Sequence, residues 1–132
     1  MMPMRAAFRF DASPAMGAGH AYRCLTLAEA LTGLGWRCYG ITNGGAAATV
    51  PALRGNPALT LGSEDSVAAR PADLLVVDHY GLDALWETPQ RRWAKAILVL
   101  DDLADRRHDC DVLVDQTFGR AVADYDALLP AH

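Results

Sequence analysis

Short apolar runs alternate with longer amphipathic stretches along the 132-residue chain. The apolar runs predict strands over Ala6–Phe10, Arg37–Thr42, Leu74–Val77, Ile97–Leu100 and Val112–Val114. Two of them, Leu74–Val77 and Ile97–Leu100, are continuously apolar, which is typical of strands covered on both faces. Strands that alternate with helices in this way predict a parallel sheet and an α/β fold.

The amphipathic stretches between the strands predict helices. Tyr22–Leu34 has an apolar residue at every third position from Leu25, so one face of this helix should lie on the sheet. Gly35 follows, and glycine suits the left-handed position that ends a helix. Leu82–Ala94 predicts another helix, in which Pro89 should break the helix or displace its last turns.

The remaining segments have weaker patterns. Residues 44–62 are rich in Gly, Ala and Pro, and they predict a short helix over Ala46–Leu53 and a short strand over Leu59–Leu61. Tyr125–His132 contains Leu-Leu-Pro without a strand or a helix cap, so we expect the chain to stop at a domain edge. We interpret residues 1–132 as a single domain of ordinary size.

Composition and charge narrow the classes of function. The chain is 52% hydrophobic with a net charge of −4, so it should bury a core. No window approaches the roughly 18 consecutive apolar residues that span a bilayer, and the N-terminal residues enter a strand pattern instead of a signal peptide. We therefore expect a cytoplasmic protein without a membrane partner. The acidic balance argues against a nucleic-acid partner, which needs a concentrated basic face.

The cysteine pattern points to core residues. Cys24, Cys38 and Cys110 are odd in number, widely spaced and set in apolar surroundings. Such a pattern indicates neither a disulfide framework nor a zinc site. We expect all three thiols to be buried, and we expect no metal.

The most distinctive motif follows the first strand, in FRFDASPAMGAGHAYRCLTLAEAL. The strand ends at Asp11, a turn contains Gly17 and Gly19, and a helix begins near His20. Such a turn lets the backbone approach a ligand, and a helix N-terminus favours an anion. It differs from a dinucleotide-binding turn because Tyr22 replaces the third glycine, and from a P-loop because no Gly-Lys-Ser/Thr follows. NAD is therefore disfavoured as a cofactor.

His20 is the residue of this turn that is best suited to a catalytic role. The positive end of a helix dipole favours the neutral imidazole, which can accept a proton. Alternatively, His20 only caps the helix or hydrogen-bonds to the loop.

Polar residues also follow the strand Leu74–Val77, in LLVVDHYGLD. Because the loops after parallel strands meet at one edge of a sheet, Asp78, His79 and Tyr80 can converge with His20. Tyr80 could then hydrogen-bond near a reacting oxygen. In the alternative interpretation, Asp78 caps the next helix while His79 and Tyr80 pack.

A third strand end holds two adjacent carboxylates. Asp101 and Asp102 resemble a metal site only superficially, because adjacent side chains usually point apart and other oxygen ligands are not evident. We expect a structural role for them, with one capping and the other bonding to a neighbouring loop. His108, in a charged loop, should be solvated. The sequence has no nucleophile elbow or Ser-His-Asp pattern, so a base acting on water is the simpler chemistry.

Together the three strand ends resemble the N-terminal half of the PseG/SpsG family, nucleotide-sugar hydrolases of pseudaminic acid biosynthesis. The similarity is carried by FRFDASPAMGAGHAYRCLTLAEAL, LLVVDHYGLDALWE and ILVLDDLADRRHDCDVLVDQ, in the family's order and approximate spacing. The resemblance implies a Rossmann-like three-layer sandwich with a mainly parallel sheet, equivalent to the N-terminal half of a GT-B fold. It also implies addition of water at the anomeric carbon of a UDP-linked 2,4-diacetamido-2,4,6-trideoxyhexose, with release of UDP and without a metal or other cofactor.

Residue roles follow from the same resemblance. His20 is expected to act as the base on water, and Tyr80 to contact the sugar or the water near the scissile bond. The residues expected to bind the substrate are Asp11, Ser13, Gly17, Gly19, Arg23, Asp78, His79 and Asp101.

The resemblance implies a C-terminal domain that looks like the main holder of the UDP moiety, and we do not expect that domain within these 132 residues. The expected partners are therefore a UDP-sugar and that second domain, and the chain alone should be nearly inactive because reactant positioning supplies much of catalysis. Two other functions stay open, a GT-B glycosyltransferase and a non-catalytic module that binds sugar nucleotides.

Overall fold

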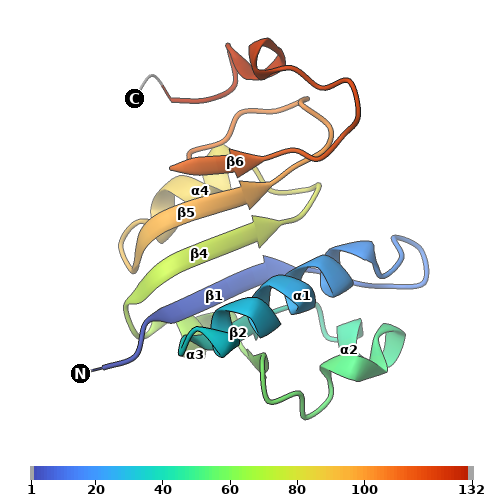
Figure 1. The fold of residues 1–132 in the computed structure, drawn as a ribbon, viewed down its shortest axis with the longest axis vertical. Helices are drawn as coiled ribbons and strands as arrows, with labels where there is room; N and C mark the ends of the chain where they lie inside the picture. Colours follow the sequence, from blue (N-terminus) through green and yellow to red (C-terminus); the bar gives the residue numbers. More distant parts are fainter. Residues whose placement is uncertain (1, 131–132) are drawn as a thin grey trace.

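The fold is built on a six-stranded sheet in which every neighbouring pair is parallel (Figure 1). The computed structural model describes residues 2–130. The strand order is β3-β2-β1-β4-β5-β6. The strands are β1 (Arg5–Phe10), β2 (Arg37–Ile41), β3 (Thr60–Gly62), β4 (Ala72–Asp78), β5 (Ala94–Leu100) and β6 (Val112–Val114). The predicted Rossmann-like α/β fold is confirmed.

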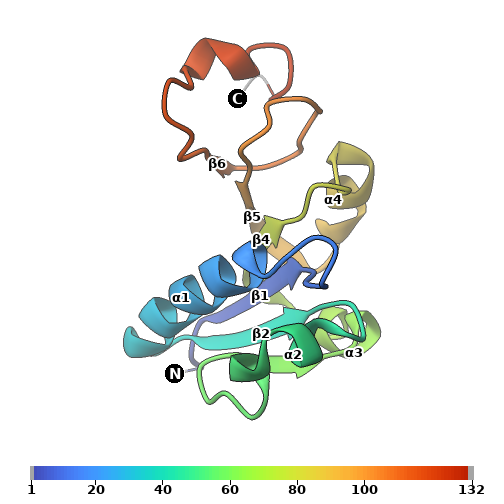
Figure 2. The same ribbon diagram turned by 90° about the vertical axis from the view of Figure 1, so that its right-hand side faces the viewer.

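Helices lie on both faces of the sheet, with α1 on one side and α3 and α4 on the other (Figure 2). The helical elements are α1 (Gly19–Gly33), α2 (Ala46–Thr49), the 3-10 turn η1 (Pro51–Leu53), α3 (Glu64–Ala68), α4 (Ala84–Gln90) and the 3-10 turn η2 (Val122–Tyr125). No helix among residues 2–130 is long and apolar enough to cross a membrane.

Each face of the sheet has its own core, because successive side chains of a strand point to opposite faces. Phe8 and Phe10 of β1 pack on the α1 side together with Cys24 and Val76. Leu75, Ile97 and Val99 pack on the other side with Trp93. The three cysteines are free and buried, as predicted.

Several element boundaries differ from the sequence prediction. The helix predicted over Leu82–Ala94 is only Ala84–Gln90, since Ala94 already pairs with Ala72 in the sheet. Pro89 lies inside this helix near its C-terminal end, as expected for a residue that displaces the last turns. The predicted helix over Ala46–Leu53 is divided into α2 and η1, with Pro51 at the start of the second part.

Other differences concern short elements at the ends of longer ones. The helix α1 begins at Gly19, three residues before the predicted start, and the residues after it include Gly35 with φ +93°. The strand predicted over Leu59–Leu61 is shifted by one residue. Helix α3 was not predicted, although Ser63 caps it by accepting a hydrogen bond from the Ser66 N–H. Of the predicted domain edge, the last two residues lie outside the described residues.

The sheet topology determines where a site can form. β1 and β4 are neighbours, but the chain leaves them towards opposite sides of the sheet, to α1 and α4. In open α/β sheets, ligands bind outside the carboxyl ends of the strands at such a switch point. The loops that follow β1, β4 and β5 all lie at this edge.

Candidate active site

A histidine and an aspartate from neighbouring elements form the centre of the site. His20 lies in the first turn of α1, and Asp78 is the last residue of β4. The His20 Nδ1 atom is 2.5 Å from Asp78 Oδ1, and Asp78 is completely buried. An ionised carboxylate only accepts hydrogen bonds, so Nδ1 carries the proton. In the neutral imidazole, Nε2 is then left as the acceptor.

Arg23 holds the same carboxylate from the next turn of α1. Its Nε donates to Asp78 Oδ2 over 2.7 Å and its Nη2 to Oδ1 over 2.6 Å, in the bidentate geometry that arginine and carboxylate favour. Burial opposes ionisation of Asp78, but the hydrogen bonds from His20 and Arg23 outweigh it and hold the pKa of this carboxyl below its usual range. Asp78 is therefore a carboxylate at neutral pH. It does not cap α4, whose N-cap is Asp83.

Tyr80 packs against the histidine, as the convergence of the two loops predicted. The rings of Tyr80 and His20 meet edge to face, with 4.5 Å between their centroids and 82° between their planes. The Tyr80 hydroxyl donates to Asp102 Oδ2 over 2.9 Å. This hydrogen bond raises the pKa of Tyr80, so the phenol keeps its proton at neutral pH.

These side chains border one open pocket of about 210 Å³. It is lined by Met16, Gly19, His20, Arg23, Tyr80 and Asp102. Within the described part of the chain, His20 Nε2 has no hydrogen-bond partner, whereas Nδ1 is held by Asp78. The pocket therefore presents the Nε2 acceptor of an imidazole whose tautomer is fixed by Asp78.

Asp11 and His79 are not among the residues that line the pocket, and they bond to each other. Asp11 Oδ2 accepts from His79 Nε2 over 2.7 Å, while His79 Nδ1 accepts from the Gly81 N–H over 2.9 Å. Asp11 Oδ1 accepts from the Asn43 N–H and from Arg9. Burial opposes ionisation of Asp11, but the hydrogen bonds from Arg9 and His79 outweigh it and lower its pKa. The pair joins the loops after β1, β2 and β4.

Ser13 and Gly17 close the turn before α1. The Gly17 N–H donates to the Ser13 carbonyl over 2.7 Å, and Ser13 Oγ accepts from the Met16 N–H. Gly17 has φ +84°, which a residue with a side chain rarely adopts. Of the two predicted glycines, only Gly19 lines the pocket.

The side chains of Asp101 and Asp102 point apart, as predicted, and they have different partners. Asp101 is buried and accepts hydrogen bonds from the Ala104 N–H, Arg106 and the Tyr125 hydroxyl. Burial opposes its ionisation, but these partners hold the pKa of Asp101 below its usual range. The structure does not place Asp101 in the pocket. Asp102, which the sequence analysis did not include in the site, lines the pocket instead.

The prediction that His108 is solvated is wrong. Its side chain is fully buried, and its Nδ1 lies 2.8 Å from Oε2 of Glu87, which is itself fully buried on α4. The charged residues next to His108 in the sequence favoured an exposed loop, and its partner Glu87 belongs to another element, α4. Among residues 2–130, no group of three or more His, Cys, Asp or Glu side chains is arranged to hold a metal ion.

A similarity to one curated protein supports the family resemblance, whereas the family models do not. No protein-family model matches the chain. Over 133 aligned positions the chain is 26% identical to UDP-2,4-diacetamido-2,4,6-trideoxy-beta-L-altropyranose hydrolase of Campylobacter jejuni. The match covers 96% of this chain and 47% of the hydrolase, so the chain spans about half the length of this relative. The similarity confirms the predicted resemblance and indicates a function related to nucleotide sugars.

Proposed function

We propose that this chain is the half of a UDP-sugar hydrolase that supplies the catalytic base. The reaction adds water at the anomeric carbon of a UDP-linked 2,4-diacetamido-2,4,6-trideoxyhexose and releases UDP, as a step of pseudaminic acid biosynthesis. The observation that carries the proposal is the His20–Asp78 pair, in which a buried carboxylate fixes the tautomer of a histidine that lines the pocket.

The proposed chemistry needs one proton transfer at the protein. His20 Nε2 takes a proton from water as the water oxygen bonds to the anomeric carbon, and the bond from that carbon to the phosphate oxygen breaks. Asp78 keeps its charge and stabilises the imidazolium that forms, as a carboxylate does in hydrolytic triads. Arg23 holds the carboxylate in the orientation that this role requires.

Tyr80 restricts the orientation of the base. The two rings meet edge to face, and the Tyr80 hydroxyl is hydrogen-bonded to Asp102, so ring packing holds the imidazole in addition to its hydrogen bond to Asp78. A base that is held in one orientation loses less entropy on the way to the transition state. This packing supports a positioning role for the ring together with contact to the sugar or water.

The leaving group would be held mainly by a second domain. Among the described residues that line the pocket, Arg23 is the one arginine or lysine, and both of its hydrogen bonds to Asp78 are already made. The charge of Arg23 is therefore balanced by Asp78, so the described residues that line the pocket offer no uncompensated cation to a phosphate.

The proposed reaction can be tested in a chimera in which this chain replaces the matching part of the Campylobacter hydrolase. We expect release of UDP from the UDP-linked diacetamido sugar in H₂¹⁸O without any acceptor, and ¹⁸O in the sugar product. Label in UDP would show attack at phosphorus and contradict the proposal. Turnover that requires an added hydroxyl acceptor would instead favour a glycosyltransferase.

A further inference from the structure

The carboxylate of Asp102 has acceptor capacity that the protein does not use. Its Oδ2 accepts the hydrogen bond from Tyr80, but its Oδ1 is buried and has no hydrogen-bond partner among the described residues. An ionised carboxylate offers about four lone-pair sites, of which this contact fills one. Buried polar atoms are normally paired, so an unpaired oxygen beside a pocket indicates a missing donor.

The backbone at Asp102 is held by hydrogen bonds, so only the side chain has an unpaired acceptor. The Asp102 carbonyl accepts from Arg120 Nη2 over 2.8 Å and from Thr117 Oγ1 over 3.4 Å. The terminal torsion of an aspartate is soft, so the carboxylate can turn between its two oxygens while the backbone stays fixed. Such a turn would bring the unpaired Oδ1 towards the pocket that Asp102 lines.

The charge of Asp102 also restricts what the pocket accepts. No arginine or lysine among the described residues lies within ion-pair distance of this carboxylate, and Arg23 is engaged by Asp78. A carboxylate accepts hydrogen bonds from N–H and O–H groups and repels a phosphate at short range. The pocket therefore suits the uncharged, donor-bearing end of a sugar nucleotide.

We infer that Asp102 is a specificity-determining residue, which accepts a hydrogen bond from an N–H or O–H donor of an acetamido sugar and keeps phosphate out of the pocket. This inference rests on the proposed function, since it assigns the sugar end of that substrate to this pocket. It also gives Tyr80 a second purpose, because the Tyr80 hydroxyl holds the carboxylate at the pocket wall.

The inference is tested by NMR titration of the 132-residue chain with N-acetylglucosamine and, separately, with inorganic phosphate. In wild type we expect the sugar to shift the amide signals of Gly19, His20 and Tyr80, and phosphate to leave them unchanged. Asp102→Ala should raise the dissociation constant for the sugar about tenfold, the loss expected for one hydrogen bond to a charged group. Asp102→Asn, which keeps the shape, should let phosphate shift the same signals.

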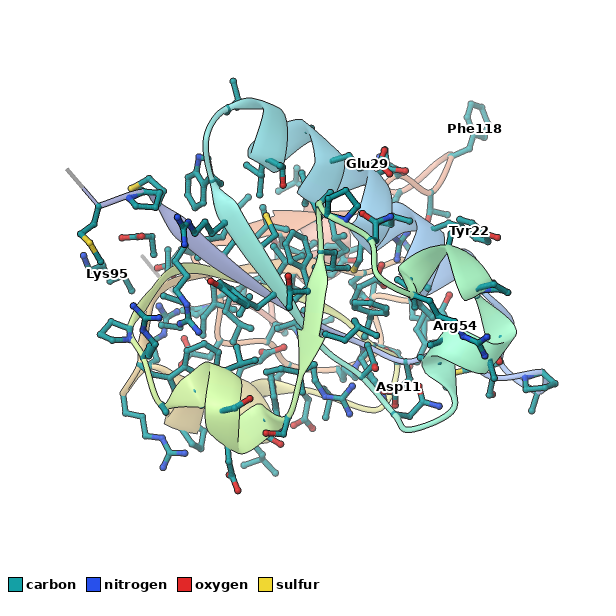
Figure 3. All side chains as sticks on the ribbon, turned by 90° about the horizontal axis from the view of Figure 1, so that it is seen from below. Asp11, Tyr22, Glu29, Arg54, Lys95 and Phe118 are labelled. Carbon is teal, nitrogen blue, oxygen red and sulfur yellow. The ribbon has the colours of Figure 1, made fainter. Side chains whose placement is uncertain are left out.

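Matched variants make the outcome decisive. Asp65→Asn removes the same charge from the exposed helix α3 and should behave as wild type towards both ligands. Tyr80→Phe should weaken sugar binding, whereas Tyr22→Phe, at an exposed tyrosine of α1, should not (Figure 3). Equal sugar affinity in wild type and Asp102→Ala, or no sugar shifts at the pocket in wild type, would overturn the inference.

The titration is independent of the hydrolysis assay. Unchanged sugar affinity in Asp102→Ala, with UDP still released by the chimera, would refute this inference and leave the proposed function standing. Sugar binding without any UDP release would refute the proposed function alone.

Discussion

At the scale of single residues, the chemistry of the site depends on which nitrogen of His20 carries the proton. Asp78 decides this, because it is buried, ionised and bonded to Nδ1. Arg23 compensates the buried carboxylate, which would otherwise be costly to desolvate. The three residues form one unit, so a change in any of them should alter the protonation or orientation of the base.

Replacement of Asp78 by Asn tests this arrangement. The amide of Asn can donate or accept a hydrogen bond, so it no longer selects the Nδ1–H tautomer. We expect long-range ¹H–¹⁵N spectra to show the Nδ1–H form of His20 in wild type near neutral pH and a change of tautomer in the variant. In the chimera, UDP release should fall by about 10²–10⁴-fold. An Nε2–H tautomer in wild type would contradict the assignment.

The three thiols should be unreactive in the folded protein. Burial raises the pKa of Cys24, Cys38 and Cys110, that of Cys110 to about 12. The thiolate is the reactive form, and reagents also need access. We expect no reaction with Ellman's reagent at mildly alkaline pH until a denaturant unfolds the chain. Rapid titration of any thiol in the native protein would show that one of these sites is open.

Part of the site could be predicted at the residue scale. His20, Asp78 and Tyr80 converge as the positions of their strand ends predicted. The role of Asp102 was not predictable, because adjacent residues point apart and the sequence does not say which of the two enters the pocket. The pairing of His108 with Glu87 was not predictable either, because the two residues are 21 positions apart in the sequence.

At the scale of elements, α4 and the segment between β5 and β6 are tied together through a buried contact. Glu87 of α4 bonds to His108 Nδ1 and also accepts from the Asp109 N–H over 2.7 Å. The segment that contains these partners also contains Asp102, which it presents to the pocket. The stability of this contact therefore supports the wall of the site.

Replacement of Glu87 by Ala should be strongly destabilising. It leaves His108 buried without its hydrogen-bond partner, and breaking a buried pair of this kind costs about 3–5 kcal/mol. The matched control is Glu29→Ala, at an exposed position of α1, which should change the free energy of unfolding by less than about 0.5 kcal/mol. Urea unfolding measures both. Equal stability of the two variants would show that the buried contact contributes little.

The prediction of helices and strands succeeded where the hydrophobic pattern was clear. It failed where pairing with a distant strand determines the end of an element. The central strands and α1 were found from continuous apolar runs and from helical spacing. The last turn of the predicted helix over Leu82–Ala94 was wrong because Ala94 joins the sheet, a contact with residues far away in the sequence. Helix α3 has only five residues, too few for a period to be detected.

At the scale of the whole molecule, the carboxylates link stability to pH. Among the residues that the structure describes, Asp11, Asp78 and Asp101 of the site region and three further aspartates have a pKa below the ordinary value of 3.8. Hydrogen bonds are the largest influence on Asp73 and Asp109, whereas in the others burial raises the pKa and is outweighed by hydrogen bonds and cations. The set is Asp11, Asp73, Asp78, Asp101, Asp109 and Asp115.

This set predicts the direction of acid denaturation. Below pH 3.8 the unfolded chain binds more protons than the folded one, so acid favours unfolding. The stabilisation from these groups is fully present above 3.8 and is lost as the pH falls through their folded pKa values. We expect a lower urea midpoint at about pH 3 than at about pH 5. A midpoint that rises on acidification over this range would contradict the assignment.

The whole molecule presents the candidate site at the carboxyl edge of a parallel sheet, and it spans about half the length of the hydrolase that it resembles. The fold class and this edge were predictable, because a parallel sheet brings its strand ends together.

The most direct test of the central claim is UDP release by the chimera that contains His20→Asn. If His20 is the base, the rate should fall by about 10²–10⁴-fold relative to wild type, with the fold intact as judged by the urea midpoint. Tyr22→Phe, an exposed substitution on the same helix, should keep the wild-type rate. Undiminished UDP release by the His20→Asn protein would contradict the account.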